Sequence, residues 1–402
     1  MPLTATEQRI AQAVAARAAD LLDDLRLHVA LPTGMGNTAA LDETRERLTA
    51  RLVALGATNE RIPGEPKPAW LHGVKPGATP PPAAVCRRPV GDLPRLLIAG
   101  HLDTVHDPAS EFRELSIRPD GKTATGPGCV DMKGGLVIAV AALEALEQVG
   151  VRTSWTFFLN SDEETGTYHS HAALDAVARE HDLGIALEPA LPGGELAVER
   201  MGAGQFMIET RGRSAHVGRD FASGVSAVTA LARCLVAIAE MPDPERGRIL
   251  SVGPLQGGPV TNAVPDLARA WGNVRFPDPA MGDEIARLLD ALATAPDAIP
   301  AVKIFRSFNR PAKPLIPQTE ALALRARAAA EDLGQKLPFA KTGGVCDGNI
   351  MQHAGLPTID TLGVRGGGLH TPDEWIELPS LVERCQLLAI LLHRLSTPAS
   401  GA

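Results

Sequence analysis

Short apolar runs that end in polar clusters recur along the chain, and they predict a parallel sheet. The first run leads into Gly-His-Leu-Asp, the second into Asn-Ser-Asp-Glu-Glu, the third into Glu-Pro, and the last into a glycine run. Continuous apolar strands separated by helices are typical of a parallel sheet covered on both faces. Ligands bind beyond the carboxyl ends of such strands, so the polar clusters predict one active site. The runs are residues 96–99, 155–159, 183–187 and 357–362, with a helix predicted over residues 132–148.

The N-terminal region predicts helices followed by a loop. Residues 1–30 alternate apolar and charged positions, which indicates one amphipathic helix and not a secretion signal. Residues 39–55 have helical periodicity. Residues 62–82 contain seven prolines and predict a long surface loop.

The middle of the chain has a different pattern, which predicts a second domain. Strands are expected at residues 205–211, 249–255, 267–276 and 301–308, and helices at residues 223–241 and 281–294. The order β-α-β-β-α-β is the ferredoxin-like plan. We therefore expect residues 200–312 to be an α+β domain inserted into an α/β domain made of residues 1–199 and 313–402.

Composition and charge narrow the function classes. The 402 residues fit about two domains, and 45% hydrophobic with 21% charged residues is ordinary for a globular protein. A formal net charge of −8 argues against electrostatic binding of the whole protein to nucleic acid or to an anionic membrane. No apolar stretch approaches the ~20 residues that a membrane span needs. Five widely spaced cysteines without a CxxC pair favour reduced thiols in a cytoplasmic protein and argue against a thiolate zinc site.

Two histidines and several carboxylates stand at predicted strand ends. His101 and Asp103 are two residues apart, so both can face one side, and a carboxylate there can fix the orientation of a metal-binding imidazole. The alternative is a surface histidine beside a strand-end acid. Asp131 stands among glycines directly before the predicted helix. It can be a helix cap, or a carboxylate that bridges two metals where the glycines allow close backbone approach.

Glu163 and Glu164 are adjacent acids after an apolar strand. A buried pair needs positive charge nearby, which a metal centre supplies, and one acid can then stay free as a general base. The alternative is a solvated acidic loop. Glu188 and His370 are weak signals when each is taken alone. Together, however, two histidines and three or four carboxylates are enough ligands for two zinc-like ions without sulfur.

These motifs resemble the co-catalytic di-zinc peptidases and deacylases, which include glutamate carboxypeptidase, acetylornithine deacetylase, succinyl-diaminopimelate desuccinylase and aminoacylase. The resemblance covers nearly the whole chain. It rests on residues 100–105 (Gly-His-Leu-Asp-Thr-Val), on residues 126–135 around Asp131, and on residues 163–166 (Glu-Glu-Thr-Gly). It implies a zinc-exopeptidase catalytic domain with an inserted lid and dimerisation domain. It also implies a cis peptide bond after Asp131.

The resemblance also implies roles for the polar residues. His101, Asp131 and Glu188 would bind one metal, while Asp131, Glu164 and His370 would bind the other. The metals implied are zinc, with cobalt or manganese as alternatives. Asp103 would orient His101, and Glu163 would take the proton of the attacking water.

The predicted lid domain adds four residues. His216, in Gly-Arg-Ser-Ala-His-Val-Gly, resembles the family's lid histidine, which stabilises the oxyanion and often acts in the partner subunit's site. Asn262 resembles a substrate-contacting asparagine. Arg275 and Arg310 resemble the arginines that bind the substrate carboxylate in the glutamate carboxypeptidase branch, and the alternative for both is a surface or interface salt bridge. His169 and His171 depart from the family's pattern. They could line the pocket, but we interpret them as exposed helix residues.

The substrate class follows from the same resemblance. Residues 31–34 (Leu-Pro-Thr-Gly) and Arg310 favour a glutamate-carboxypeptidase-like enzyme that cleaves N-acyl or peptidyl amino acids with a free carboxylate. The alternative within the family is a deacylase of the acetylornithine or desuccinylase type. An alternative of another class is a non-catalytic relative that binds ligands through its metals. A homodimer formed through the lid is expected by resemblance.

Overall fold

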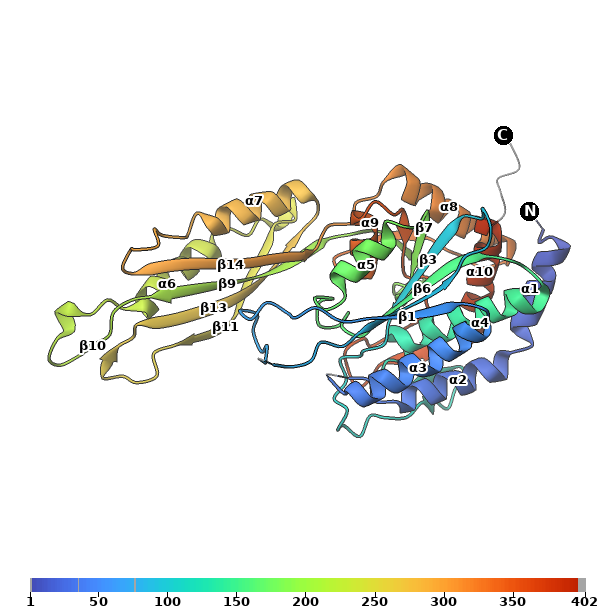
Figure 1. The fold of residues 1–402 in the computed structure, drawn as a ribbon, viewed down its shortest axis with the longest axis horizontal. Helices are drawn as coiled ribbons and strands as arrows, with labels where there is room; N and C mark the ends of the chain where they lie inside the picture. The colour runs from blue at the N-terminus through green and yellow to red at the C-terminus, as the bar shows by residue number, and fades with distance from the viewer. Residues whose placement is uncertain (1, 35, 76, 397–402) are drawn as a thin grey trace.

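The computed structural model describes residues 2–34, 36–75 and 77–396, so Met1 and Pro76 of the predicted N-terminal helix and loop lie outside the described residues. Figure 1 shows two bodies along the long axis of the molecule, and the first and last described residues belong to the larger one. A six-stranded sheet lies in the larger body. Its order is β1 (Thr58–Ile62), β2 (Ala83–Arg88), β6 (Ser154–Asn160), β3 (Arg95–His101), β7 (Leu183–Ala186) and β16 (Thr358–Ile359).

The sheet confirms the predicted parallel strands and adds two strands that the pattern did not predict. Strands β6, β3, β7 and β16 are parallel, and β3 pairs with β6 from Arg95 opposite Ser154 to His101 opposite Asn160. Strands β1 and β2 extend one edge in antiparallel fashion. Strand β1 is exposed at four of its five positions, so it has no alternating apolar pattern to reveal it.

Helices cover both faces of this sheet, as predicted. One face packs against α1, α2, α3, α4 and α10, and the other packs against α5 and α9. Helix α8 contributes to the first core. The helices are α1 (Ala5–Ala15), α2 (Ala18–Ala30), α3 (Thr38–Ala54), α4 (Gly134–Val149), α5 (His171–Ala178), α8 (Pro317–Asp332), α9 (Asp347–His353) and α10 (Pro379–Ser396).

The single N-terminal helix was a wrong prediction, because the segment forms two helices that break at Ala16 and Arg17. The break lets each helix bury its own apolar stripe. Val14 of α1 and Leu25 of α2 are both fully buried. Arg17 also donates to the carboxylate of Glu144 on α4, which fixes the chain at the break.

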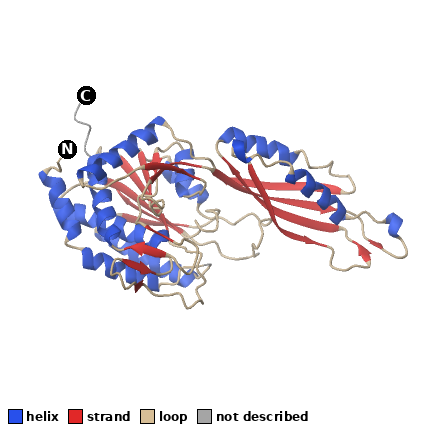
Figure 2. Cartoon of the chain, turned by 180° about the vertical axis from the view of Figure 1, so that it is seen from behind, coloured by secondary structure: helices blue, strands red, loops and turns tan. Residues whose placement is uncertain are grey.

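The smaller body is a four-stranded antiparallel sheet with two helices on one face, as Figure 2 shows. The order of elements along the chain confirms the predicted ferredoxin-like plan. We call this body the lid, and we propose residues 200–312 as its extent. The sheet order is β11 (Ile249–Gly257), β13 (Leu267–Phe276), β9 (Gly202–Arg211) and β14 (Ala301–Arg310), and the helices are α6 (Ala227–Ala239) and α7 (Pro279–Asp290).

Three small sheets complete the described fold, and strands of two to five residues are too short for a recognisable period. Their strands are β4 (Ser116–Ile117), β5 (Thr123–Thr125), β17 (Gly366–Gly367) and β18 (Trp375–Glu377); β8 (Leu196–Arg200) and β15 (Phe339–Thr342); and β10 (Ala215–His216) and β12 (Ala263–Val264). In the described part of the chain, no helix combines the length and apolar character that a membrane crossing requires.

The two connections between the bodies lie side by side. Arg200 and Lys313 exchange backbone hydrogen bonds of 2.9 and 3.0 Å. Both cationic side chains also reach the buried carboxylate of Asp360, at 2.8 Å and 3.2 Å. A buried anion shared by two cations holds both crossings at one point, which fixes where the lid leaves the larger body.

Candidate active site

The predicted ligands converge at the carboxyl edge of the parallel strands. His101 ends β3, Glu164 follows β6, and Glu188 follows β7. His370 follows β17, and Asp131 lies in the turn before α4. Because parallel strands end at the same edge, residues far apart in the sequence meet there.

Asp131 lies between two histidines. Its Oδ1 is 3.2 Å from Nε2 of His101, and its Oδ2 is 3.5 Å from Nε2 of His370. Glu164 Oε2 lies 3.3 Å from the same nitrogen of His370. One ligand atom each from His101, Asp131 and Glu164 lies within 4.8 Å of the others, so these three form a candidate metal site. One carboxylate oxygen toward each imidazole is the arrangement that a bridging ligand requires.

The backbone around Asp131 is held from outside the motif. The peptide bond from Asp131 to Met132 is cis, as the resemblance implied. The buried carboxylate of Glu374 accepts hydrogen bonds from the backbone N–H groups of Gly128, Val130 and Asp131, at 2.8, 2.9 and 3.0 Å. The helix-cap interpretation of Asp131 is wrong, since α4 begins after Lys133 without a side-chain cap.

Asp103 contacts the site in two ways. Its backbone carbonyl lies 2.9 Å from Nδ1 of His101, whereas its carboxylate oxygen Oδ1 lies 3.6 Å from that nitrogen. The carboxylate instead accepts the backbone N–H groups of Glu163 and Glu164, at 3.2 and 3.0 Å. Asp103 therefore orients the imidazole through its main chain and holds the turn of the two acids through its side chain.

The electrostatics of the cluster fit bound cations. Burial raises the pKa of Asp103 to about 8. The charge of His101 acts to lower this pKa, and the charge of Glu164 acts to raise it. Burial also raises the pKa of Glu164 and Glu188 above the usual carboxyl range, and neighbouring carboxylates add to it. Hydrogen bonds to Asp131 and Glu164 raise the pKa of His370 to about 10.

A further sign is an orphaned oxygen. Oε1 of Glu188 is buried without a hydrogen-bond partner among the described residues. Burying several carboxylates together is costly unless positive charge compensates them. Nitrogen and oxygen donors in this number suit divalent ions such as zinc. The residues present therefore fit a metal centre.

Glu163 is paired with a lid residue. Nη2 of Arg310 donates to Oε1 of Glu163 at 2.7 Å and to its backbone carbonyl at 3.0 Å. It also donates to the hydroxyl of Thr167. Arg310 is buried, and its Nε and Nη1 have no hydrogen-bond partner among the described residues, although Nη1 lies 3.7 Å from a carboxylate oxygen of Asp347.

The other predicted lid residues lie in two places. Arg275 and Arg310 both pair in register with Ala203, on opposite sides of β9, so their side chains share one face of the lid sheet. His216 and Asn262 are exposed and adjacent at the far end of the lid, where β10 pairs with β12 (Figure 1). Within this chain they are not brought to the His101 cluster.

Some contacts were missed by the sequence interpretation. The site or its supporting turns are contacted by Glu374, Thr167 and Lys67. Only Glu374 could have been suspected from the sequence, because it lies four residues after His370. His169 and His171 are half-buried and not exposed, which corrects the prediction. His169 Nδ1 lies 2.5 Å from the carbonyl of Glu65 in the Pro-rich loop, so this contact covers it.

The cysteines lie apart from this chemistry. All five are free and buried. Burial raises the pKa of the Cys129 and Cys346 thiols well above their ordinary value. A thiol held in its neutral form is a poor nucleophile, so neither cysteine is suited to covalent catalysis.

Histidines and carboxylates gathered at the carboxyl edge of a mixed sheet, beside an inserted lid, suit a metal-dependent hydrolase. Residues 97–394 match the sequence profile of peptidase family M20/M25/M40, and the chain belongs to that family. The recognised resemblance is thereby confirmed.

Individual relatives agree with this assignment. Carboxypeptidase G2 of Pseudomonas sp. (strain RS-16) is 26% identical over 303 residues, covering 74% of this chain and 73% of the relative. Succinyl-diaminopimelate desuccinylase of Methylobacterium sp. (strain 4-46) is 30% identical over 322 residues, covering 72% and 78%. The crystal structure of a tripeptidase from Staphylococcus aureus subsp. aureus Mu50 superposes with a TM-score of 0.73 at 22% identity, covering 94% of this chain and 99% of that one.

Proposed function

We propose that the protein hydrolyses the amide bond of N-acyl or peptidyl amino acids with a free carboxylate, in the manner of a glutamate carboxypeptidase. The observation behind this proposal is the position of Glu163. It lies beside the His101–Asp131 cluster, and the buried guanidinium of Arg310 holds it at 2.7 Å. A carboxylate with no partner among the candidate ligands is suited to act as a general base.

Two divalent ions, most simply zinc, would complete the site, and cobalt or manganese would suit the same donors. His101, Asp131 and Glu188 would hold one ion. Asp131, Glu164 and His370 would hold the other. Bound ions of this kind polarise the scissile carbonyl and lower the pKa of the attacking water.

The chain's own residues move the proton. Arg310 holds Oε1 of Glu163, which leaves Oε2 to accept a proton from the attacking water. Glu163 then passes this proton to the nitrogen of the leaving amine. Asp103 keeps the turn of Glu163 and Glu164 in place through its two accepted N–H bonds.

The substrate carboxylate would bind on the lid side. The Nε and Nη1 groups of Arg310 are buried donors without hydrogen bonds among the described residues. Nε and Nη1 lie on different edges of the guanidinium, so a substrate carboxylate can accept a charge-assisted hydrogen bond from one of them. Arg275 adds positive charge on the same face, and Asn262 would contact the substrate from a lid tip. The desuccinylase relative favours a second candidate, an N-acyl-amino-acid deacylase of the acetylornithine deacetylase or desuccinylase type.

A homodimer through the lid would supply the residues that lie far from the cluster. Edge strand β11 and helix α6 expose apolar side chains, with Leu255 61% and Val236 68% exposed. Such a patch is typical of a protein interface. His216 would then reach the partner's site and stabilise the oxyanion there. Val236→Glu should yield monomers in sedimentation velocity, and an unchanged dimer would contradict this interface. The five buried free thiols suit a cytoplasmic location.

The deciding experiment is an assay of zinc-loaded protein on N-acetyl, N-succinyl and N-aroyl derivatives of glutamate, ornithine and diaminopimelate. We expect hydrolysis that a chelator abolishes and zinc restores, with glutamate derivatives preferred. Preference for acetylornithine or succinyl-diaminopimelate would favour the second candidate. Metal binding without turnover on any compound would favour the non-catalytic relative.

A further inference from the structure

A segment of the Pro-rich loop crosses from the larger body to the lid. We call residues 64–75 the strap. Trp271 of β13 donates its indole N–H to the carbonyl of Trp70 at 2.7 Å. The Trp70 ring lies 6.3 Å from that of Phe305 on β14, and the His72 ring lies 5.1 Å from that of Trp271, edge to face. The strap therefore rests on the lid face that α6 and α7 leave uncovered.

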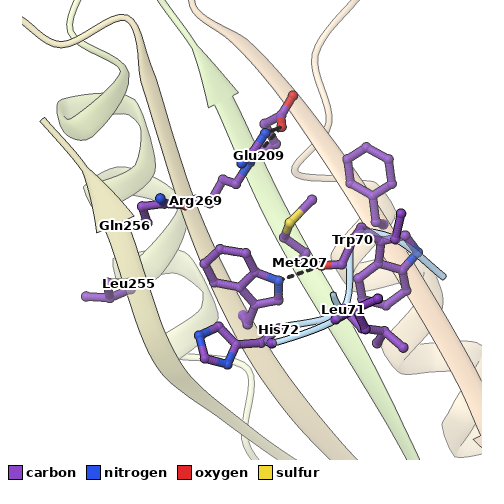
Figure 3. A pocket seen from close by; sticks show the side chains of 13 residues that line it. Trp70, Leu71, His72, Met207, Glu209, Leu255, Gln256 and Arg269 are labelled. Carbon is purple, nitrogen blue, oxygen red and sulfur yellow. Dashed lines mark hydrogen bonds and ion pairs between the residues drawn. The ribbon is translucent and has the colours of Figure 1, made fainter. Parts of the chain in front are cut away.

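A cavity of about 660 Å³ lies between the strap and this face (Figure 3). Its volume is that of a small-molecule site. Only 3% of the chain is aromatic, yet two of its four tryptophans, Trp70 and Trp271, line the cavity together with Phe305. Several rings around one cavity offer stacking surfaces for a planar group.

The charged groups at the cavity favour an uncharged ring. The carboxylate of Glu209 accepts hydrogen bonds from Arg269 and Arg211, at 2.8 and 2.7 Å. Of these charged groups only Arg269 and Glu209 line the cavity, and their charges cancel, so the cavity offers no net charge to attract an ion.

The strap and the lid sheet both lead from this cavity to the candidate active site. Nζ of Lys67 donates to the hydroxyl of Thr165 at 2.6 Å, and Thr165 follows Glu164 directly. On the lid sheet, Arg310 pairs with Ala203, whereas Phe305 pairs with Met207. Four residues along β9 span about 13 Å, so the cavity lies roughly that far from the buried guanidinium on the same sheet face.

We propose that this cavity is a subsite for the distal end of the substrate's acyl or peptidyl part, and that it binds a planar aromatic group about 13 Å from the carboxylate-binding arginine. The inference rests on the proposed function, because it assumes that the carboxylate binds Arg310. It predicts that the preferred substrates are extended compounds that end in a ring, and that short acyl groups leave the cavity empty.

Two matched substrates test the subsite. Both are glutamate acylated with a 6-aminohexanoyl chain. The far nitrogen of that chain carries a benzoyl group in one compound and an acetyl group in the other, so only the ring differs. We expect a KM about tenfold lower for the benzoyl compound, with similar kcat. Phe305→Ala should raise the KM of the benzoyl compound about tenfold and change that of the acetyl compound less than twofold. Phe305→Tyr retains a ring and should keep the lower KM for the benzoyl compound. Leu324→Ala, at an exposed position of α8, is the control and should keep it too.

Equal KM values for the two compounds in the unmodified protein would overturn the subsite, as would Phe305→Ala lowering kcat equally for both. If neither compound is cleaved, the proposed function fails, and tryptophan fluorescence then decides the subsite alone. Quenching by the benzoyl compound that the acetyl compound does not produce, and that Phe305→Ala removes, supports it. The absence of that difference overturns it.

Discussion

Nη2 of Arg310, at the end of lid strand β14, lies 2.7 Å from Oε1 of Glu163, which follows strand β6 of the other body. The contact joins the lid to the turn that presents the two adjacent acids. Asn309 reinforces it by donating to the carbonyl of Gly166. The lid thus holds the proposed general base directly, so lid position and proton transfer are expected to be coupled.

Replacing each of the two adjacent acids should have different consequences. Glu163→Gln should keep both metals and lower kcat about 10²–10⁴-fold, because only proton transfer is lost. Glu164→Gln should lose metal, because it removes a ligand oxygen. Metal content and steady-state kinetics on the same preparations measure both effects. Metal loss in Glu163→Gln with residual turnover would mean that the two roles are exchanged.

Replacing Arg310 should affect both binding and turnover. Arg310→Ala removes the partner of Glu163 and the proposed carboxylate contact, so kcat/KM should fall at least about 100-fold. Arg310→Lys should recover little, since a single ammonium group cannot hold Glu163 and the substrate carboxylate through N–H groups on separate nitrogens. Kinetics on an acyl amino acid and on its carboxamide analogue separate the two roles. If Arg310→Ala lowers activity on both compounds equally, the carboxylate contact is not made by this residue.

Glu374 should control metal affinity without binding metal. Its carboxylate accepts three backbone N–H groups of the segment that presents Asp131. Glu374→Ala should weaken zinc binding about 10–100-fold, as loss of a group that positions a ligand typically does. Competition with a chromophoric chelator measures it. Glu383→Ala, a half-exposed acid paired with Arg365, is the matched control and should bind zinc normally.

His28 should make the fold sensitive to acid. Its side chain is 3% exposed, and burial, with the charges of Arg51 and Lys133, lowers its pKa to about 4. The unfolded chain therefore takes up a proton near pH 6.5 that the folded chain refuses until about pH 4, so stability falls as pH drops through this window. The loss between pH 7 and pH 5 should be ~2 kcal/mol. Urea unfolding at both pH values should show a smaller loss in His28→Leu, and an equal loss would contradict this assignment.

The sequence by itself determined the parallel strands, the ferredoxin-like order of the lid and the residues at the strand ends. Apolar runs are local signals, and the parallel topology then brings His101, Glu164 and Glu188 to one edge. Strand β1 was missed because its exposed side chains leave no alternating pattern. The break at Arg17 was missed because packing against α4 sets it, and this helix is far away in the sequence.

Only the tertiary structure decided how the site is supported and how far it extends. Glu374 reaches the segment of Asp131 across 243 residues, and the indole of Trp271 meets the carbonyl of Trp70 across 201. Arg310 meets Glu163 across 147 residues of chain that include most of the lid. Such contacts leave no periodic or compositional trace, because each depends on where the tertiary fold places two distant segments and not on the local preferences of either segment.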